Sequence, residues 1–471
     1  MIVNDVHSGL NKTRVRDVVR PTTIDEVRNI VQSAAIRGRS ISICGSRHAM
    51  GGQQFLADED LVDMRGLNRV LALDMERGLV TAEAGIEWPA LIEGYLTLQI
   101  ERDPTIEPLW GIAQKQTGAD ALTLGGALAA NAHGRGLTMP PIIHDVESFT
   151  LVNARGDLVV CSREEHPELF SLAIGGYGLF GVIVTVTLRL CRRVPLRRVV
   201  RLIDIDDAVN AARRRIDDGF LYGDFQFDID PHSRGFLTKG VFACYEPAPT
   251  SRPPAAPGRE LAAADWEHLL LLAHTDKAKA FALYAQHYIA TDGQLYWSDT
   301  HQLGIYLDGY HERIDAALAS PCRCSEMISE LYVPHDRLVD FLRDASQLLT
   351  ERGSEVIYGT IRLIREDSES FLPWAANDQA CVIFNLHVRH TPDGLQHAQE
   401  SFRALFDLAL DRGGRFFLTY HRWATRDQLM RGYPMLPDFI ARKEFYDPKQ
   451  TFSSDWYRWL RETVMNQPQS T

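Results

Sequence analysis

Apolar and polar residues near the N-terminus follow a helical period and then a strand period. The helical part has one apolar face, made of Ile24, Val27, Ile30, Val31 and Ala34. Thr23 and Glu26 have the spacing of a capping box, and Gly38 marks the end of the helix. The β-prone run Ser40–Cys44 follows. This order predicts a helix that leads into a buried strand.

Short strand patterns continue through the first third of the chain. They cover Leu61–Met64, Val70–Leu73 and Leu79–Ala84, a hairpin over Ser148–Cys161, and the β-branched run Val182–Leu190. Trp88–Tyr95 between them reads as a short helix. One helix–strand unit followed by several small strands predicts an α+β fold, not a long doubly wound sheet.

Longer elements alternate after the basic stretch Arg192–Arg198. Strand patterns at Ser329–Val333 and Ala380–Val388 are interleaved with helical patterns at Asp336–Thr350 and Gln396–Asp411. This texture predicts a second domain with an antiparallel sheet covered by helices. We therefore expect three parts, with bounds 1–195, 196–435 and a C-terminal segment 436–471 that returns to the first.

The loop after this first predicted strand contains residues that suit the binding of a ligand. Gly45, Gly51 and Gly52 surround a single histidine, His48. Glycines allow sharp turns and bring backbone N–H groups close to phosphate oxygens. The loop matches neither G-x-G-x-x-G nor the P-loop motif. A turn without a ligand is the alternative interpretation.

A second segment, 121–136, is dense in small residues. Gly125 and Gly126 interrupt it near its start, and His133 precedes another glycine near its end. Such residues let a backbone lie flat against a planar ligand. The alternative is a tightly packed helix with a buried, hydrogen-bonded histidine.

Composition narrows the class of protein. The chain has 471 residues, 45% hydrophobic and 24% charged, which is ordinary for a globular protein. A net charge of −12 argues against a nucleic-acid partner. We find neither a signal peptide nor a membrane-spanning stretch, and the seven scattered cysteines are typical of reduced thiols in a cytoplasmic protein. Cys322 and Cys324 lack a companion pair, so we expect no metal site.

Four motifs in order give the chain a family resemblance. They are Arg20-Pro21-Thr22, Gly45-Ser46-Arg47-His48, Thr123-Leu124-Gly125-Gly126 with His133-Gly134, and Gly175-Gly176 to Gly181-Val182-Ile183. Together they resemble the FAD-binding domain of the vanillyl-alcohol-oxidase (PCMH-type) flavoproteins. The chain is most similar to the branch of alditol oxidase, the aldonolactone oxidases and decaprenylphosphoryl-ribose oxidase. Gly413-Gly414-Arg415 and the run Arg442–Pro448 extend that resemblance toward the C-terminus.

The resemblance implies FAD as cofactor and a set of residues that bind it. These are Cys44, Gly45, Ser46, Arg47, His48, Ala49, Met50, Gly51, Gln53, Gly118, Thr123, Leu124, Gly125, Gly126, Ala130, His133, Ile183 and Phe417. His48 falls where alditol oxidase attaches the flavin covalently, so we hypothesise the same bond. No cysteine lies in 99–160, which argues against a second, cysteinyl attachment.

Substrate-side candidates lie in the second domain. Glu330 resembles the glutamate on a strand of the sugar oxidases, and Arg362 matches the arginine of a Glu-x-Arg motif whose glutamate is replaced by Thr360. A structural ion pair between Glu330 and Arg362 is the alternative. The period of two on the strand Ala380–Val388 places Cys381, Ile383, Asn385 and His387 on one face, where Asn385 or His387 could contact substrate or remain interior residues.

Tyr420 stands where the decaprenylphosphoryl-ribose enzyme has a catalytic lysine, and its neighbours His421 and Arg422 could compensate for the lost cation. The loss disfavours a lipid-phosphate substrate.

The resemblance implies oxidation of a hydroxyl group on a small polyol, sugar or related alcohol. Hydride would pass to flavin N5, and O₂ would be the acceptor and yield H₂O₂. Three alternatives stay open: a dehydrogenase with another acceptor, an NADPH-dependent C=C reductase, and a flavin-containing binding protein. The sequence leaves the substrate and the oligomeric state open.

Overall fold

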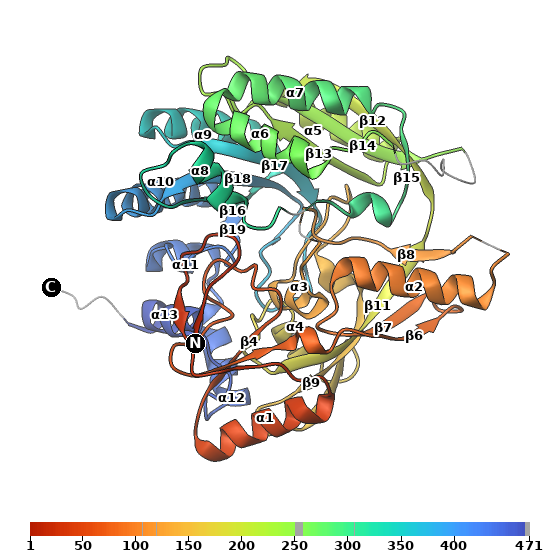
Figure 1. Cartoon of the computed structure of the whole chain (residues 1–471), viewed down its shortest axis with the longest axis vertical. Coiled ribbons are helices and arrows are strands. Elements are labelled where there is room, and N and C mark those ends of the chain that lie inside the picture. Colours follow the sequence, from red (N-terminus) through yellow and green to blue (C-terminus); the bar gives the residue numbers. More distant parts are fainter. Residues whose placement is uncertain (106, 119, 250–257, 306, 467–471) are drawn as a thin grey trace.

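Three sheets of three or more strands organise the chain in the computed structural model, which describes residues 1–105, 107–118, 120–249, 258–305 and 307–466 (Figure 1). The smallest contains β3 (Val18–Val19), β5 (Asp60–Asp63) and β4 (Ile41–Cys44), paired in parallel in that order. α1 (Ile24–Arg37) connects β3 to β4. The Thr23 hydroxyl caps α1 by accepting from the Glu26 N–H, and Gly38 ends it in the left-handed region, as predicted.

The second sheet is antiparallel. Its strands run in the order β10 (Leu158–Ser162), β9 (Val146–Val152), β11 (Val182–Arg192), β7 (Leu79–Glu83) and β6 (Val70–Asp74), and β8 (Trp110–Ile112) also pairs with β11. The helices of this region are α2 (Trp88–Arg102), α3 (Leu124–Ala130) and α4 (Pro167–Ala173). α2 runs two turns past its predicted end at Tyr95. Its last turns contain Gln99, a buried amide that bonds the backbone around Trp110.

The third sheet has eight strands, and every pair in it is antiparallel. The order is β15 (Leu295–Trp297), β12 (Pro195–Asp204), β14 (Lys239–Pro247), β13 (Tyr222–Phe227), β17 (Val356–Ile364), β18 (Gln379–Arg389), β16 (Cys324–Pro334) and β19 (Arg415–Phe416). This sheet forms the upper part of the molecule in Figure 1. The predicted α+β class, with a sheet-based second domain, is confirmed.

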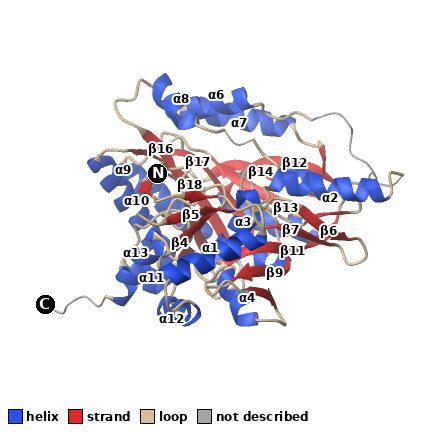
Figure 2. Cartoon of the chain, turned by 60° about the horizontal axis from the view of Figure 1, so that its bottom comes forward, coloured by secondary structure: helices blue, strands red, loops and turns tan. Residues whose placement is uncertain are grey.

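Helices cover both faces of this large sheet (Figure 2). One layer contains α6 (Ala263–Thr275), α7 (Lys277–Ala290) and α8 (Tyr310–Ala317), and the other contains α5 (Ile205–Asp217), α9 (Leu338–Arg352) and α10 (Pro392–Leu410). Val241 packs under α7, whereas Phe384 contacts Phe341 of α9. Because side chains alternate along strands, the residues on either side of Phe384 in β18 face the α6–α8 layer, as Val241 does in β14.

Residues near the C-terminus lie against the first sheet. α11 (Arg426–Gly432), α12 (Leu436–Tyr446) and α13 (Asp455–Met465) follow the large sheet, and Phe452 pairs with Ile41 of β4 in parallel. At the N-terminus, β1 (Ile2–Val3) pairs with β2 (Thr13–Arg14). Residues near both ends of the chain thus pack against β4.

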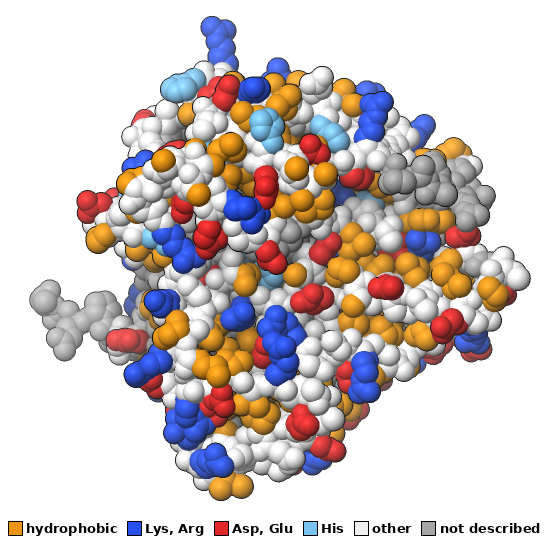
Figure 3. Space-filling model, in the orientation of Figure 1, with side chains coloured by type: hydrophobic (Ala, Val, Ile, Leu, Met, Phe, Trp, Pro, Cys, Tyr) orange, Lys and Arg blue, Asp and Glu red, His pale blue; other side chains and the backbone are white. Residues whose placement is uncertain are grey.

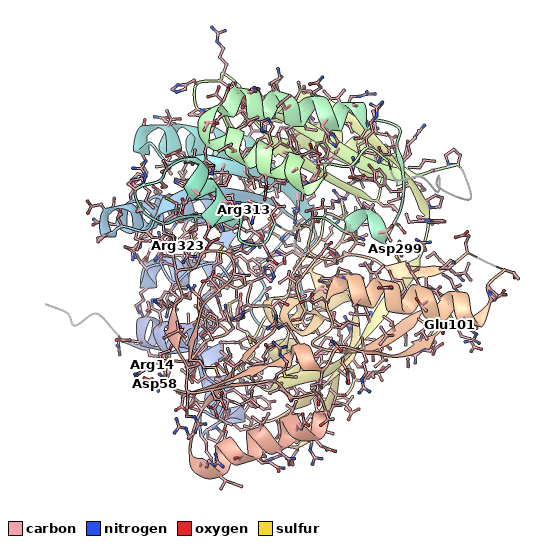
Figure 4. All side chains as sticks on the ribbon, in the orientation of Figure 1. Arg14, Asp58, Glu101, Asp299, Arg313 and Arg323 are labelled. Carbon is pink, nitrogen blue, oxygen red and sulfur yellow. The ribbon has the colours of Figure 1, made fainter. Side chains whose placement is uncertain are left out.

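A buried ion pair links α2 to the large sheet. The Asp299 carboxylate, labelled in Figure 4 beside α2, accepts from Arg193 at 2.9 Å and from the Tyr95 hydroxyl at 3.0 Å. Asp299 is fully buried. Removing one partner of such a pair typically costs about 3–5 kcal/mol, so this contact fixes the two regions relative to each other.

Acidic and basic side chains are interspersed on the molecular face that Figure 3 shows, with no broad patch of one sign. Among the described residues, no helix is both long and apolar enough to cross a membrane. The cytoplasmic location stays a prediction.

Candidate active site

One large cavity, of about 850 Å³, reaches from the loop after β4 to the α6–α8 face of the large sheet. The loop lines it with Cys44 through Ala49, and α3 contributes Gly125, Gly126 and Ala130. The two glycine-rich segments therefore face the same space, although about 80 residues separate them in the sequence.

The closest approach between these segments is at Gly45 and Thr123. A Cβ atom built on Gly45 would lie 2.0 Å from the Thr123 hydroxyl oxygen, so no side chain fits there. Thr123 also caps α3 by accepting from the Gly126 N–H at 3.2 Å. Gly45 is required by this close packing, since its φ is not positive.

The loop presents backbone donors to the cavity. Within the described ranges, the N–H groups of Ser46, Arg47 and Ala49 donate no hydrogen bond to protein. Arg47 adopts φ 61°, a left-handed conformation that is costly for a residue with a side chain. N–H groups that line a cavity and have no protein acceptor suit an anionic ligand such as a pyrophosphate.

Most predicted cofactor residues line this cavity. They are Cys44, Gly45, Ser46, Arg47, His48, Ala49, Gln53, Gly118, Thr123, Gly125, Gly126, Ala130, Ile183 and Phe417. A histidine at position 48 is thus placed beside the ligand space, and burial together with His7 lowers its pKa to about 3. Its imidazole is therefore neutral at neutral pH.

Four predicted cofactor residues do not line the cavity. The N–H groups of Met50 and Gly51 both donate to the Thr419 carbonyl at 3.1 Å, and that of Leu124 donates to the Ile86 carbonyl. These groups have protein acceptors and are turned away from the cavity. His133 lies behind Glu330, because its Nδ1 contacts the Gly134 carbonyl and its Nε2 lies 3.1 Å from the Glu330 carboxylate.

The sheet side of the cavity is polar. Glu330 of β16, Arg362 of β17, Asn385 of β18 and Tyr420 line it. The resemblance implied the first two and Tyr420, whereas the period of two on β18 put Asn385 on one face with Ile383, which also lines the cavity. Gln226 of β13 lies on the same side and donates to the Tyr358 hydroxyl at 2.9 Å. We had not predicted Gln226, although its alternation with Phe225 and Phe227 marks the same face.

Glu330 is the centre of a buried hydrogen-bond network. The hydroxyl of Tyr420 donates to one carboxylate oxygen, and Tyr332 (2.8 Å) and His133 bond the other. Burial alone raises the pKa of Glu330, but His133, Tyr420 and Arg362 outweigh it and hold the pKa below its ordinary value. Glu330 is therefore a carboxylate. Burial and the charge of Glu330 raise the pKa of Tyr420 well above 10, so Tyr420 is a neutral phenol.

Arg362 is a buried cation at the cavity wall. Its side chain is 6% exposed, and among the described residues it forms no ion pair and donates no hydrogen bond. The expected alternative, an ion pair with Glu330, is not formed. A buried charge without a partner costs several kcal/mol, so this guanidinium indicates a ligand that carries or develops negative charge.

Two predicted substrate-side residues lie elsewhere. His387 is on the expected face of β18 but contacts Glu326 of β16 at 3.2 Å, beyond the cavity. His421, which we expected to offset the missing lysine, is buried among Phe402, Phe406 and Trp423 and does not line the cavity. Arg422 does not line the cavity either, so neither neighbour of Tyr420 replaces that cation.

The residues present fit an FAD molecule. A glycine loop with available N–H groups, the helix α3 with Gly125 and Gly126, and a polar substrate wall all border one cavity. The second segment is thus a packed helix followed by a buried His133 with polar contacts, which was the alternative interpretation of its sequence. The volume of about 850 Å³ is in the range of cofactor sites.

Comparison with known proteins agrees with this geometry. Residues 16–99 match the model of an FAD binding domain. The chain is 26% identical over 444 residues to L-gulono-1,4-lactone dehydrogenase of Mycobacterium tuberculosis, covering 94% of this chain and 95% of the relative. It is 23% identical to L-gulonolactone oxidase of Bos taurus, with 92% of each covered. The mitochondrial L-galactono-1,4-lactone dehydrogenase of Arabidopsis thaliana is 29% identical over 40% of this chain and 28% of its own length.

The fold and the site thus define an FAD-dependent oxidoreductase with a PCMH-type FAD-binding domain. Within that class, the predicted likeness to the aldonolactone oxidase branch is confirmed, because the similarity runs through nearly the whole chain.

Gly45→Ala tests the close approach of the two segments. The added methyl group displaces Thr123, so we expect the purified variant to contain less than half the FAD of the wild type. Absorbance of the purified protein measures this. Gly304→Ala, at another cavity position where the nearest atom to a Cβ is 3.8 Å away, is the matched control and should retain its FAD. Full FAD occupancy in Gly45→Ala would contradict the role of this contact.

Proposed function

We propose that this chain oxidises a CH–OH group of a sugar-derived lactone or polyol, with FAD as hydride acceptor and O₂ as the final acceptor. The observation that carries the proposal is the unpaired Arg362 guanidinium beside the Glu330–Tyr420 pair, in the same cavity as the glycine loop. The printed activities of the relatives support the substrate class. Bound FAD would supply the hydride-accepting chemistry.

The protein groups then position the substrate and move its proton. The Tyr420 hydroxyl donates to Glu330, which leaves its oxygen lone pairs to accept a hydrogen bond from a substrate hydroxyl. A proton passing from substrate to Tyr420 releases the tyrosine proton to the Glu330 carboxylate. Arg362 stabilises negative charge that develops on the substrate, and Asn385 and Gln226 offer further hydrogen bonds to hydroxyl groups.

Arg362→Ala removes the only charge-stabilising group that this scheme uses. We expect kcat to fall about 10²–10³-fold, the range for losing one such group, while the flavin remains bound. Steady-state peroxide release and flavin absorbance measure both effects. Arg365→Ala is the matched control, because Arg365 lies on the surface and pairs with Asp378. Unchanged turnover in Arg362→Ala would exclude Arg362 from the reaction.

Tyr420→Phe breaks the proposed proton relay and leaves the ring in place. We expect kcat to fall about 10²–10⁴-fold, the usual contribution of a positioned acid or base. In the wild type, kcat/KM should stay flat from pH 7 down to below 4.5, because Glu330 is protonated only there. Tyr446→Phe, which removes another tyrosine–glutamate contact that is not part of the cavity lining, should keep its activity. A Tyr420→Phe enzyme as fast as the wild type would contradict the relay.

His48 is our proposed site of covalent flavin attachment. It lines the cavity, and a neutral imidazole has the lone pair that bond formation requires. The wild type should keep its yellow colour on the denatured chain, and His48→Asn should release FAD on denaturation. His397→Asn, an exposed histidine, should behave as the wild type. Free FAD in denatured wild-type protein would contradict the attachment without affecting the proposed reaction.

A dehydrogenase that uses another acceptor is the second candidate, and the names of two relatives favour it. Peroxide formed in step with substrate oxidation distinguishes the two.

A further inference from the structure

Three histidines surround one glutamate on the large sheet, outside the cavity. Their side chains come from four elements, and we call them the His–Glu cluster: His274 at the end of α6, His311 in α8, Glu326 in β16 and His387 in β18. The side chains are between 2% and 10% exposed. The cavity lining does not include them.

The contacts in the cluster are short but only partly hydrogen-bonded. Glu326 Oε1 lies 3.1 Å from His274 Nε2 and 3.2 Å from His387 Nδ1, and Glu326 Oε2 contacts His311 Nδ1. Only the His387 contact has hydrogen-bond geometry. Within the described part of the chain, His274 Nε2 and both His311 nitrogens are buried and lack a hydrogen-bond partner.

An ion pair explains only part of this arrangement. One imidazolium is enough to neutralise one carboxylate, whereas here three imidazoles converge on it. Buried nitrogens without a hydrogen-bond partner are unfavourable, and coordination of a metal cation would satisfy them.

The distances suit a zinc ion. Zinc binds imidazole nitrogen and carboxylate oxygen at about 2.0–2.2 Å in a tetrahedron, which puts neighbouring ligand atoms about 3.3 Å apart. The contacts of 3.1 and 3.2 Å are close to that value, and the ligand atoms of His274, Glu326 and His387 all lie within 4.8 Å of one another. A set of imidazoles with one carboxylate favours zinc over calcium or magnesium.

We propose that His274, Glu326 and His387 form a zinc site that holds α6 on the face of the large sheet, while His311 of α8 contacts the second oxygen of Glu326. Three protein ligands leave the fourth position of the tetrahedron to a water molecule. The site revises the expectation from cysteine spacing that the chain binds no metal.

The position of the cluster gives the metal a role in shaping the substrate wall. Glu326, Ile328 and Glu330 share one face of β16, and in the register Glu326 is opposite His387 while Ile328 is opposite Asn385. Glu326 and Glu330 are four residues apart on this strand, which corresponds to about 13 Å. Ala273 and Tyr310, the neighbours of His274 and His311, line the cavity. Arg313 and Arg323, labelled in Figure 4, show where α8 meets the start of β16.

Zinc content tests this proposal directly. The untagged wild-type holoenzyme is equilibrated with buffered Zn²⁺, separated from free metal and assayed for zinc by elemental analysis. We expect one zinc per chain in the wild type. Glu326→Gln and His387→Gln should bind zinc more than 10-fold more weakly, and the exposed His232→Gln should match the wild type.

Thermal unfolding gives a second measurement that does not depend on the variants. Removal of zinc by a chelator should lower the Tm of the wild type, and added Zn²⁺ should restore it, since a ligand that binds only the folded state stabilises it. Wild-type protein that retains no zinc above His387→Gln, with a Tm indifferent to Zn²⁺, would overturn the proposal. Because these measurements do not use catalysis, their failure leaves the proposed function untouched.

Discussion

The close approach of Gly45 to Thr123 is the constraint on which the site depends. It brings the loop after β4 against the start of α3, at a distance that admits no side chain. Thr123 caps α3 from the same position, so one residue both begins the helix and contacts the loop. This contact between the loop and α3 forms the floor of the cavity. Without this contact, the backbone donors of the loop and the glycines of α3 would not border one space.

The opposite wall of the cavity follows from strand alternation in the large sheet. Apolar residues face α5, α9 and α10, whereas Glu330, Arg362 and Asn385 are on the opposite face, which borders the cavity and the α6–α8 layer. On that face, the two buried charged groups differ in how many protein partners they have. The Glu330 carboxylate accepts from Tyr332, Tyr420 and the Cys381 thiol and also contacts His133, whereas Arg362 has no protein acceptor among the described residues. The carboxylate is thus held in place, and the guanidinium is available to a ligand.

Much of this arrangement could be predicted from local patterns. The cap of α1, the loop with His48 and the shared face of β18 all depend on residues within a few positions of one another, where spacing decides the geometry. Which residues on one face of a strand line the cavity could not be predicted in the same way. Asn385 and His387 share a face, yet one lines the cavity and the other contacts Glu326, because their neighbours come from distant segments.

Contacts between distant segments also explain the other differences. The sequence predicted that Met50 and Gly51 bind the cofactor. In the structure, both of their N–H groups donate to the carbonyl of Thr419, which lies 368 positions beyond Gly51. The strained φ of Arg47 and the partners of Glu330 likewise depend on packing that no local motif encodes. The His–Glu cluster draws its residues from four elements and has no sequence spacing that would mark it.

The most direct test of the account is an anaerobic titration of the purified, yellow wild-type protein with aldonolactones, sugars and alditols. The account predicts that at least one of these compounds bleaches the long-wavelength flavin band, and that admitting O₂ restores the band with formation of H₂O₂. Protein that stays colourless after incubation with FAD, or a flavin that no hydroxylated sugar derivative reduces, would contradict it.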